Sequence, residues 1–471
     1  MLKNFGKDFI IYGVSSSISK FVGLFLVPLY TRIFTPDEYG SMDLISTVVA
    51  FIAIIGMMQL ESAVSRYYYA EKSELERNSL ISTAIWTLLV VSVVLLFLLI
   101  FFAKPISILL FDTNAYATIL IIGGATIPFA NLNGIFTVIM RFKRRPVHYM
   151  LFQLAHIFFT ISTTIVLVVY YKIGIIGVFI GQLGGFVIIV LLMTFYLQSN
   201  IKFIWNKSYF YKMMRYSLPL VPAVGGSWTN SYINRFVMVG YLSITEIGLY
   251  VVALKFASVL QLIGAAFRMA WPPFFWETFE NNKEHKKVFR NILQHVSPLV
   301  FSVVILLTIY AEEIVKFFAT EQYLFSANLI GMLALSYAIT NILSQIIMVG
   351  PGITKKTEFN TIIYFISVGV NVTSLFILVP SIGLIGVPVS LLLGSFSLLA
   401  VGWYNSEKLY PIGFKKTPII ISLMVVVGIV CLNYYFNLQL FVKLILTLSI
   451  IIYFLIKYRS VVTQFFWTKK Y

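Results

Sequence analysis

Five basic side chains stand within long apolar stretches of the sequence or at their ends, where a charge is costly. They are Lys20, Arg66, Arg235, Lys255 and Arg268. A cation at the centre of a lipid-facing helix costs roughly 2.5–3.5 kcal/mol or more, so such residues usually face protein or a water-filled cavity. A cation placed in this way can bind an anion, and the sign of these charges favours an anionic substrate.

Polar residues accompany these cations at helical spacing. Ser16 and Ser17 lie one turn before Lys20. A second set falls within about 80° of one direction on a helix, which predicts a wet face. Its members are Ser227, Asn230, Ser231, Asn234 and Arg235. Lys255 and Arg268 lie about 140° apart on a regular helix, so they face one cavity only if the helix bends, and we expect that bend at Gly264.

The elements that position these side chains are apolar stretches of about the length that crosses a bilayer, ~20 residues. We count fourteen. Their ranges are 9–31, 41–63, 79–103, 116–140, 149–171, 174–196, 217–239, 247–270, 295–311, 324–349, 359–379, 384–404, 418–436 and 441–457. The sequence therefore predicts an all-α polytopic membrane protein.

The loops between these spans carry charge asymmetrically. Lys443 and Lys457 stand at the two ends of the last span and are counted with the segments next to them. Both terminal segments and the even-numbered loops then hold 26 of the 35 Lys and Arg residues, whereas the odd-numbered loops hold 5. Cytoplasmic loops are enriched in Lys and Arg, so this split predicts an inner-membrane protein with both termini in the cytoplasm. Lys3 and Lys7 precede an apolar run without a small-residue cleavage site, which predicts an uncleaved first helix.

Composition limits the function further. The chain is 59% hydrophobic and 11% charged, and its longest loops of about twenty residues are too short for a soluble catalytic domain. The net charge of +17 is explained by cytoplasmic loops facing anionic lipids, without nucleic acid. A phosphate-loop motif is absent, and His148, His156, His285 and His295 lack the spacing of a zinc site. We expect neither an enzyme nor a metal or cofactor site.

The sequence also repeats itself. Residues 173–178 (IGIIGV) match 382–387 (IGLIGV) at an offset of 209, and 35–40 (TPDEYG) match 243–248 (SITEIG) at an offset of 208. Two matches at nearly one offset predict two parallel copies of six helices, as in transporters that bind substrate between their halves. The predicted divisions are an N-terminal lobe (1–200), a C-terminal lobe (201–408) and two further helices with a tail (409–471).

The opening of the chain resembles a known family. Residues 26–40 (LVPLYTRIFTPDEYG) and 60–68 (LESAVSRYY) look like the start of Wzx-type polysaccharide repeat-unit flippases of the multidrug/oligosaccharidyl-lipid/polysaccharide (MOP) superfamily. The resemblance implies a MATE-like fold of two lobes plus two helices. It implies translocation of an undecaprenyl-diphosphate-linked oligosaccharide to the periplasmic leaflet, for O-antigen or capsule synthesis. The lipid II flippases of this superfamily cluster several arginines in the first helix, where this chain has only Lys20.

This resemblance gives the cations a role, because the negative charge of a diphosphate cannot cross the hydrocarbon of the membrane unless it is compensated. We expect the five basic residues to line its path. The alternative for Arg66, Arg268 and Arg235 is that they anchor their helices by reaching the membrane surface. Membrane lipids are expected partners, and a polysaccharide polymerase and a chain-length regulator are possible ones. Whether H⁺ or Na⁺ movement drives transport is also left open.

Two further residues have alternative interpretations. Glu61 is placed to pair with Arg268 and close a cytoplasmic gate. The alternatives are a pair with Arg66 one turn away or a carboxylate at a solvated helix end. His156 lies in a polar stripe and could carry a coupling proton, although a histidine that simply packs is the commoner case. Two other functions also stay open. A cation-coupled multidrug antiporter would need buried carboxylates, and a glycan polymerase would need a large periplasmic loop.

Overall fold

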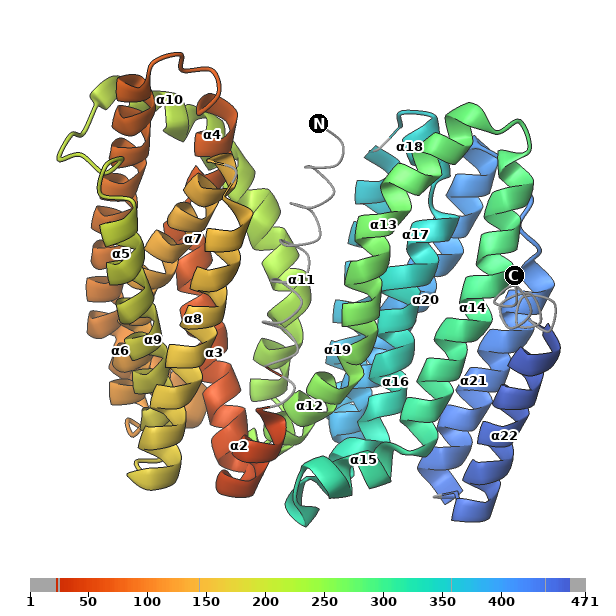
Figure 1. Ribbon diagram of the computed structural model, residues 1–471. Coiled ribbons are helices and arrows are strands. Elements are labelled where there is room, and N and C mark those ends of the chain that lie inside the picture. The colour runs from red at the N-terminus through yellow and green to blue at the C-terminus, as the bar shows by residue number, and fades with distance from the viewer. Residues whose placement is uncertain (1–22, 24–25, 144, 357, 437, 458–471) are drawn as a thin grey trace, which may run out of the picture. The chain divides into compact units, whose positions relative to one another are not determined.

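The chain folds into helices joined by short turns, as a computed structural model shows (Figure 1). The structure describes residues 23, 26–143, 145–356, 358–436 and 438–457, and for 223–231 it describes the backbone alone. Among these residues there is no β-strand. The predicted all-α class is confirmed.

The chain divides into two compact units. Unit 1 is Met1–Val251 and unit 2 is Val252–Tyr471, so the division falls inside helix α12 (Ile244–Ala257). Each unit is described by itself below. The division into lobes of residues 1–200 and 201–408 with a 409–471 extension stays a prediction.

Unit 1 holds the helices from α2 to the first half of α12. They are α2 (Val27–Ile33), α3 (Pro36–Met57), α4 (Leu60–Tyr67), α5 (Glu74–Phe111), α6 (Ala117–Gly124), α7 (Thr126–Phe142), α8 (Pro146–Ile165) with the π-helical turn η1 (Val166–Tyr170), α9 (Ile175–Tyr196), α10 (Lys207–Ser217), the 3₁₀ turn η2 (Leu218–Leu220) and α11 (Val221–Val239). One core joins α4, α5, α7, α9 and α10. Leu60, Leu80, Ile135, Met193 and Met213 are fully buried in it.

The two helices that start at the matching segments 35–40 and 243–248 begin in the same way. Thr35 caps α3, since its hydroxyl accepts from the Glu38 amide while the Glu38 carboxylate accepts from the Thr35 amide. Ser243 and Glu246 make the same reciprocal pair at the start of α12, with distances of 3.2 and 2.9 Å. Such capping boxes satisfy amides that a helix start leaves without partners.

The starts of α3 and α12 also pack on each other without side chains between them. A Cβ added to Gly40 would lie 2.3 Å from the Ile244 carbonyl oxygen and 2.8 Å from the Gly248 nitrogen. A Cβ added to Gly248 would lie 1.8 Å from the Pro36 carbonyl oxygen and 3.0 Å from the Gly40 nitrogen. The two contacts are reciprocal at an offset of 208. A local two-fold relation therefore links the repeated segments.

The second sequence match also has a common conformation. Gly174 starts α9 with a φ of 66°, and Gly383 starts the short 3₁₀ turn η5 (Gly383–Ile385) with a φ of 63°. Left-handed backbone of this kind favours glycine. The local structures thus agree with the predicted repeat at both places where it was detected.

Unit 2 continues from the second half of α12 to the end of the described chain. Its other elements are α13 (Val259–Asn281), α14 (His285–Ile309), α15 (Ala311–Phe318), η3 (Glu321–Ser326), α16 (Ala327–Ala338) with the π-helical turn η4 (Ile339–Leu343), α17 (Ser344–Ile347), α18 (Gly350–Ile353), α19 (Glu358–Ile382), η5, α20 (Gly386–Leu409), α21 (Lys416–Phe436) and α22 (Leu440–Lys457). Helix α16 is the most enclosed of these, and its residues from Leu329 to Ser336 are all buried.

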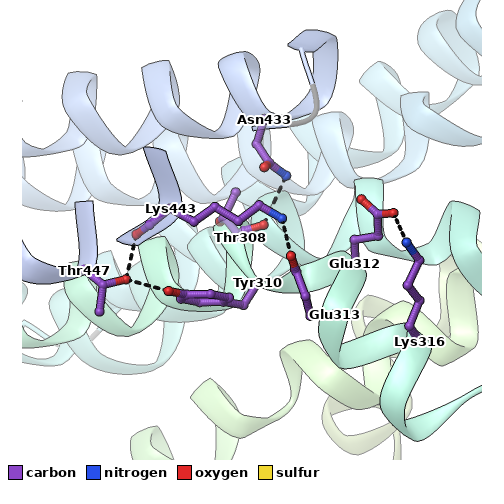
Figure 2. A network of polar contacts seen from close by, with 8 residues as sticks. All are labelled: Thr308, Tyr310, Glu312, Glu313, Lys316, Asn433, Lys443 and Thr447. Carbon is purple, nitrogen blue, oxygen red and sulfur yellow. Dashed lines mark hydrogen bonds and ion pairs between the residues drawn. The ribbon is translucent and has the colours of Figure 1, made fainter. Parts of the chain in front are cut away.

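Polar contacts attach the last two helices to the rest of unit 2 (Figure 2). Lys443 of α22 is 3% exposed, and its Nζ lies 2.6 Å from Glu313 Oε1 of α15. The hydroxyls of Tyr310 and Thr447 lie 2.9 Å apart nearby, and the Asn433 amide of α21 donates to the Thr308 carbonyl oxygen at 3.1 Å. Most of the α22 surface is apolar and exposed, so these polar contacts specify where α22 binds.

Ten helices among the described residues are long and apolar enough to cross a membrane, or eleven if the bent pair α12–α13 forms one span. One of the ten, Glu358–Leu409, contains α19 and α20, which pack on each other across η5. Of the predicted spans, 9–31 begins outside the described residues, and α11 is not among the ten. The count of fourteen therefore stays a prediction.

We predict that Gly248→Ala destabilises the protein, because its methyl group would overlap the Pro36 carbonyl oxygen. Overpacking of this kind costs about 1–3 kcal/mol. The measurement is thermal unfolding of the purified protein in detergent, followed by tryptophan fluorescence. Gly369→Ala in α19 is the control, since a Cβ there meets nothing within 4 Å. Equal melting temperatures for both variants would contradict the close helix crossing.

Candidate functional site

Arg235 of α11 lies against a carboxylate of α3. Its Nε donates to Asp43 Oδ2 at 2.5 Å, and the two side chains are 10% and 16% exposed. The residues are 192 positions apart in the chain. Two apolar helices are therefore joined by a largely buried ion pair.

Aromatic and amide groups complete the surroundings of this pair. The Tyr232 ring centre lies 4.9 Å from the guanidinium carbon of Arg235, a distance at which a cation is attracted to an aromatic face. The Asn234 amide donates to the hydroxyl of Tyr250, which is 1% exposed. We call Asp43, Tyr232, Asn234, Arg235 and Tyr250 the α3–α11 polar cluster.

The sequence placed Arg235 and Asn234 on a wet face, and both are buried in this structure, at 8% and 2% exposure. Asp43 was not among the predicted site residues. A lone carboxylate early in an apolar stretch carries little signal, because membrane interfaces often hold one. Its partner lies on another helix, and helical periodicity contains no information about contacts between distant segments.

Arg268 belongs to a separate polar group in unit 2. Its Nη1 donates to Asn341 Oδ1 at 2.5 Å, and Asn341 lies in the π-helical turn η4. One turn earlier in α13, Gly264 lets the helix approach, since a Cβ there would be 2.6 Å from Asn341 Cβ. Arg268 itself is exposed. Its fork of N–H donors suits phosphate or carboxylate oxygens.

A bend separates Arg268 from Lys255, as we expected, but it lies at a different residue from the one predicted. Helices α12 and α13 meet at an angle of 42° across Ser258, whereas we expected the bend at Gly264. The Ser258 hydroxyl donates to the Lys255 carbonyl oxygen at 2.6 Å, which uses an acceptor near the break. Gly264 serves close packing instead. Lys255 is half-buried.

Glu61 and Arg66 lie on α4, directly after a break in the membrane-spanning run. Met58 and Gln59 have φ values of 45° and 55°, and this left-handed backbone ends α3 and precedes α4. A Cβ at Gly134 of α7 would lie 2.7 Å from Glu61 Oε1, so the half-buried carboxylate packs on that helix. Arg66 is exposed. Glu61 is in unit 1 and Arg268 in unit 2, and their pairing stays a prediction.

His156 packs between α8 and α9. Its ring centre lies 4.4 Å from that of Phe186, and its Nε2 is a buried atom without a hydrogen-bond partner among the described residues. This environment is mainly apolar. The coupling role predicted as one alternative for His156 stays a prediction.

Several predicted site residues lie outside the described part of the chain. Lys20, Ser16 and Ser17 are among them, and so are the side chains of Ser227, Asn230 and Ser231. Their place in a cavity stays a prediction.

We predict different stability effects for two arginine truncations. Arg235→Ala leaves Asp43 without its guanidinium between two helices, and breaking a buried pair in this way costs roughly 3–5 kcal/mol. Arg268→Ala removes an exposed side chain and changes stability by about 0.5 kcal/mol or less. Thermal unfolding in detergent measures both. Similar losses in the two variants would contradict the difference in burial.

Comparison with known sequences shows what this arrangement is similar to. The family model described as "Polysaccharide biosynthesis protein" matches residues 29–328. The succinoglycan biosynthesis transport protein ExoT of Rhizobium meliloti is 24% identical over 319 residues, which are 66% of this chain and 62% of that protein. The Lsg locus putative protein 1 of Haemophilus influenzae is 21% identical over 284 residues, 59% of this chain and 67% of that protein. The match thus spans about three fifths of ExoT.

Comparison with solved structures shows the fold. Lipid II flippase MurJ, in an inward closed conformation, superposes with a TM-score of 0.75 over 96% of this chain and 100% of its own, at 18% identity. A mutant form of the Vibrio cholerae MATE transporter VcmN has a TM-score of 0.59 over 86% and 95% of the two chains, at 12% identity. The MATE-like fold, expected from the resemblance of residues 26–40 and 60–68, is confirmed.

Proposed function

The chain belongs to the polysaccharide biosynthesis protein family, and from that we propose that it is a flippase for lipid-linked oligosaccharides. The proposed substrate is an undecaprenyl-diphosphate-linked repeat unit that passes from the cytoplasmic to the periplasmic leaflet. Its product would serve O-antigen or capsule synthesis. ExoT and MurJ are a transport protein and a flippase, which agrees with a transporter rather than an enzyme.

The sign of the charges inside the apolar helices carries this proposal. Arg235, Lys255 and Arg268 all lie on helices α11 to α13. A cationic drug would need a carboxylate that attracts it. The charge of Asp43 is already neutralised by Arg235, which leaves Glu61 at the start of α4 as a carboxylate that could do so. This balance favours an anionic substrate over the alternative of a cation-coupled multidrug antiporter.

A diphosphate headgroup has the chemistry that these side chains recognise. Guanidinium groups bind phosphate oxygens through two parallel N–H donors, which provides both charge and orientation. The polyprenyl tail can stay in lipid while only the headgroup needs a polar path. In our proposal, Arg268 and Lys255 contact the headgroup along this path, with Lys20 and Arg66 as further contacts, and Arg235 joins them when its ion pair opens.

The excess of cations on one set of loops supports an inner-membrane location with both termini in the cytoplasm. H⁺ or Na⁺ coupling, through Glu61 or His156, is part of the same proposal, and so are contacts with a polysaccharide polymerase and a chain-length regulator. A polymerase function for this chain itself is disfavoured, because the predicted periplasmic loops are short.

We predict that deleting the gene in its host abolishes surface polysaccharide and leaves lipid-linked repeat units on the cytoplasmic side. The measurement compares surface glycan with repeat units that an impermeant reagent cannot reach, before and after the gene is restored. Repeat units that reach the periplasm without being polymerised would support the polymerase alternative. Unchanged pools together with altered drug sensitivity would support the antiporter.

We predict that Arg268→Ala reduces transport of repeat units severalfold while the amount of folded protein stays normal, because an exposed phosphate-binding donor is lost. Arg268→Lys should recover part of the activity, since it keeps the charge but loses the two-donor geometry. Arg215→Ala on the exposed face of α10 is the matched control. Full transport by Arg268→Ala would remove this residue from the substrate path.

A further inference from the structure

We propose that Asp43 is a built-in counter-ion that occupies Arg235 in the unloaded protein and is replaced there by the diphosphate of the substrate. The inference rests on the proposed function, because it takes the substrate to be a lipid diphosphate. It assigns a role to Asp43, which the charge pattern alone did not. It also explains why a buried arginine belongs to a path for anions.

The internal repeat provides the first observation. The reciprocal contacts of Gly40 and Gly248 fix the offset at 208 in this part of the chain. At that offset Asp43 corresponds to Val251, and Arg235 corresponds to Val27. Both valines are buried, with exposures of 1% and 0%. The equivalent positions are therefore apolar.

Burial gives the second observation. Removing two charges from water costs several kcal/mol per ion, and well-packed apolar residues often replace a buried ion pair without loss of stability. The two buried valines show that the other copy of the repeated segment holds apolar residues at the equivalent positions. The packing of helices α3 and α11 therefore does not by itself require an ion pair. We therefore attribute the presence of Asp43 and Arg235 to a function that needs their charges.

The chemistry of exchange gives the third step. A carboxylate and a phosphate each present a pair of oxygens that can accept the two parallel N–H donors of a guanidinium. Replacing Asp43 by a diphosphate breaks one ion pair and forms another, so Arg235 is compensated before and after. The released Asp43 carboxylate then has to be hydrated, because an unpaired buried charge is strongly disfavoured.

Exchange must therefore accompany separation of α3 from α11. With side-chain exposures of 10% and 16%, the pair is closed to a headgroup in this structure. The capped starts of α3 and α12 meet backbone to backbone at Gly40 and Gly248, which makes that crossing the part least able to separate. We infer that loading of the diphosphate and opening of the α3–α11 contact are one event.

A charge swap tests this role. Asp43→Arg or Arg235→Asp alone should lower the amount of folded protein, and the double variant should restore it. Transport should stay lost in the double variant, because the cation now projects from α3 and the carboxylate from α11. Recovery of transport together with folding would show a purely structural pair and overturn the proposal.

An ion pair in unit 2 with a buried cation is the matched control. Lys443 and Glu313 join α22 to α15, and we assign them no contact with substrate (Figure 2). The double variant Lys443→Glu with Glu313→Lys should recover both folding and transport. If this swap also lost transport while folding normally, loss in the Asp43–Arg235 swap would no longer be specific, and the proposal would fail.

A labelling experiment keeps the proposal testable if the swapped variants do not fold. Cys431 is the single cysteine of the chain, so Cys431→Ser gives a background without thiols. In this background Thr47→Cys places a reporter at a buried position one turn after Asp43 on α3. Geranylgeranyl diphosphate should increase its labelling by a membrane-impermeant thiol reagent severalfold, whereas geranylgeraniol should not.

The outcomes separate the two proposals. Labelling that the diphosphate does not change, in a protein that transports repeat units, overturns the counter-ion role and leaves the flippase function standing. Labelling that rises with the diphosphate, in a host whose repeat-unit pools do not depend on the gene, supports anion exchange and overturns the flippase function. In Asp43→Asn, labelling should already be high without ligand, and low labelling there would contradict the proposal.

Discussion

Charge compensation inside an apolar helix bundle is the constraint from which the arrangement of this protein follows. The charge of Arg235 is balanced by a carboxylate on another helix, and that of Lys443 by a partly exposed carboxylate. Arg268 donates to an amide oxygen instead, and its side chain is exposed. These three solutions differ in how easily the cation can change partners. A guanidinium bonded to an amide keeps its full charge for an anion, whereas one bonded to a carboxylate must first give up its partner.

Much of the fold could be predicted from the sequence, because its signals are local. Apolar stretches of bilayer length, capping residues at Thr35 and Ser243 and glycines at repeated positions each act within a few residues of the chain. The repeat was visible for the same reason, since short turns with strict backbone requirements, as at Gly174 and Gly383, tolerate little change. The family resemblance rested on residues 26–40 and 60–68, which include the first of these caps.

The candidate site was less predictable, because it depends on contacts between distant segments. Asp43 gains its importance from a partner 192 residues away. The break before Glu61 has left-handed backbone at Met58 and Gln59, and neither residue type is typical of that conformation. The bend near Lys255 lies at Ser258 rather than at the expected Gly264. In each case packing of neighbouring helices overrides the local preference on which sequence interpretation depends.

The crossing of α3 and α12 has a consequence for how such a chain can vary. A residue on a two-fold axis meets its own copy, as residues do at the centre of a symmetric dimer. A side chain introduced at Gly40 would meet the backbone of Ile244 and Gly248, and one introduced at Gly248 would meet the backbone of Pro36 and Gly40, so neither position has room for a side chain. Residues away from the axis meet different neighbours and are free to diverge, as Asp43 and Val251 have done. Duplication thus fixes the centre of the crossing and leaves its flanks available for new chemistry.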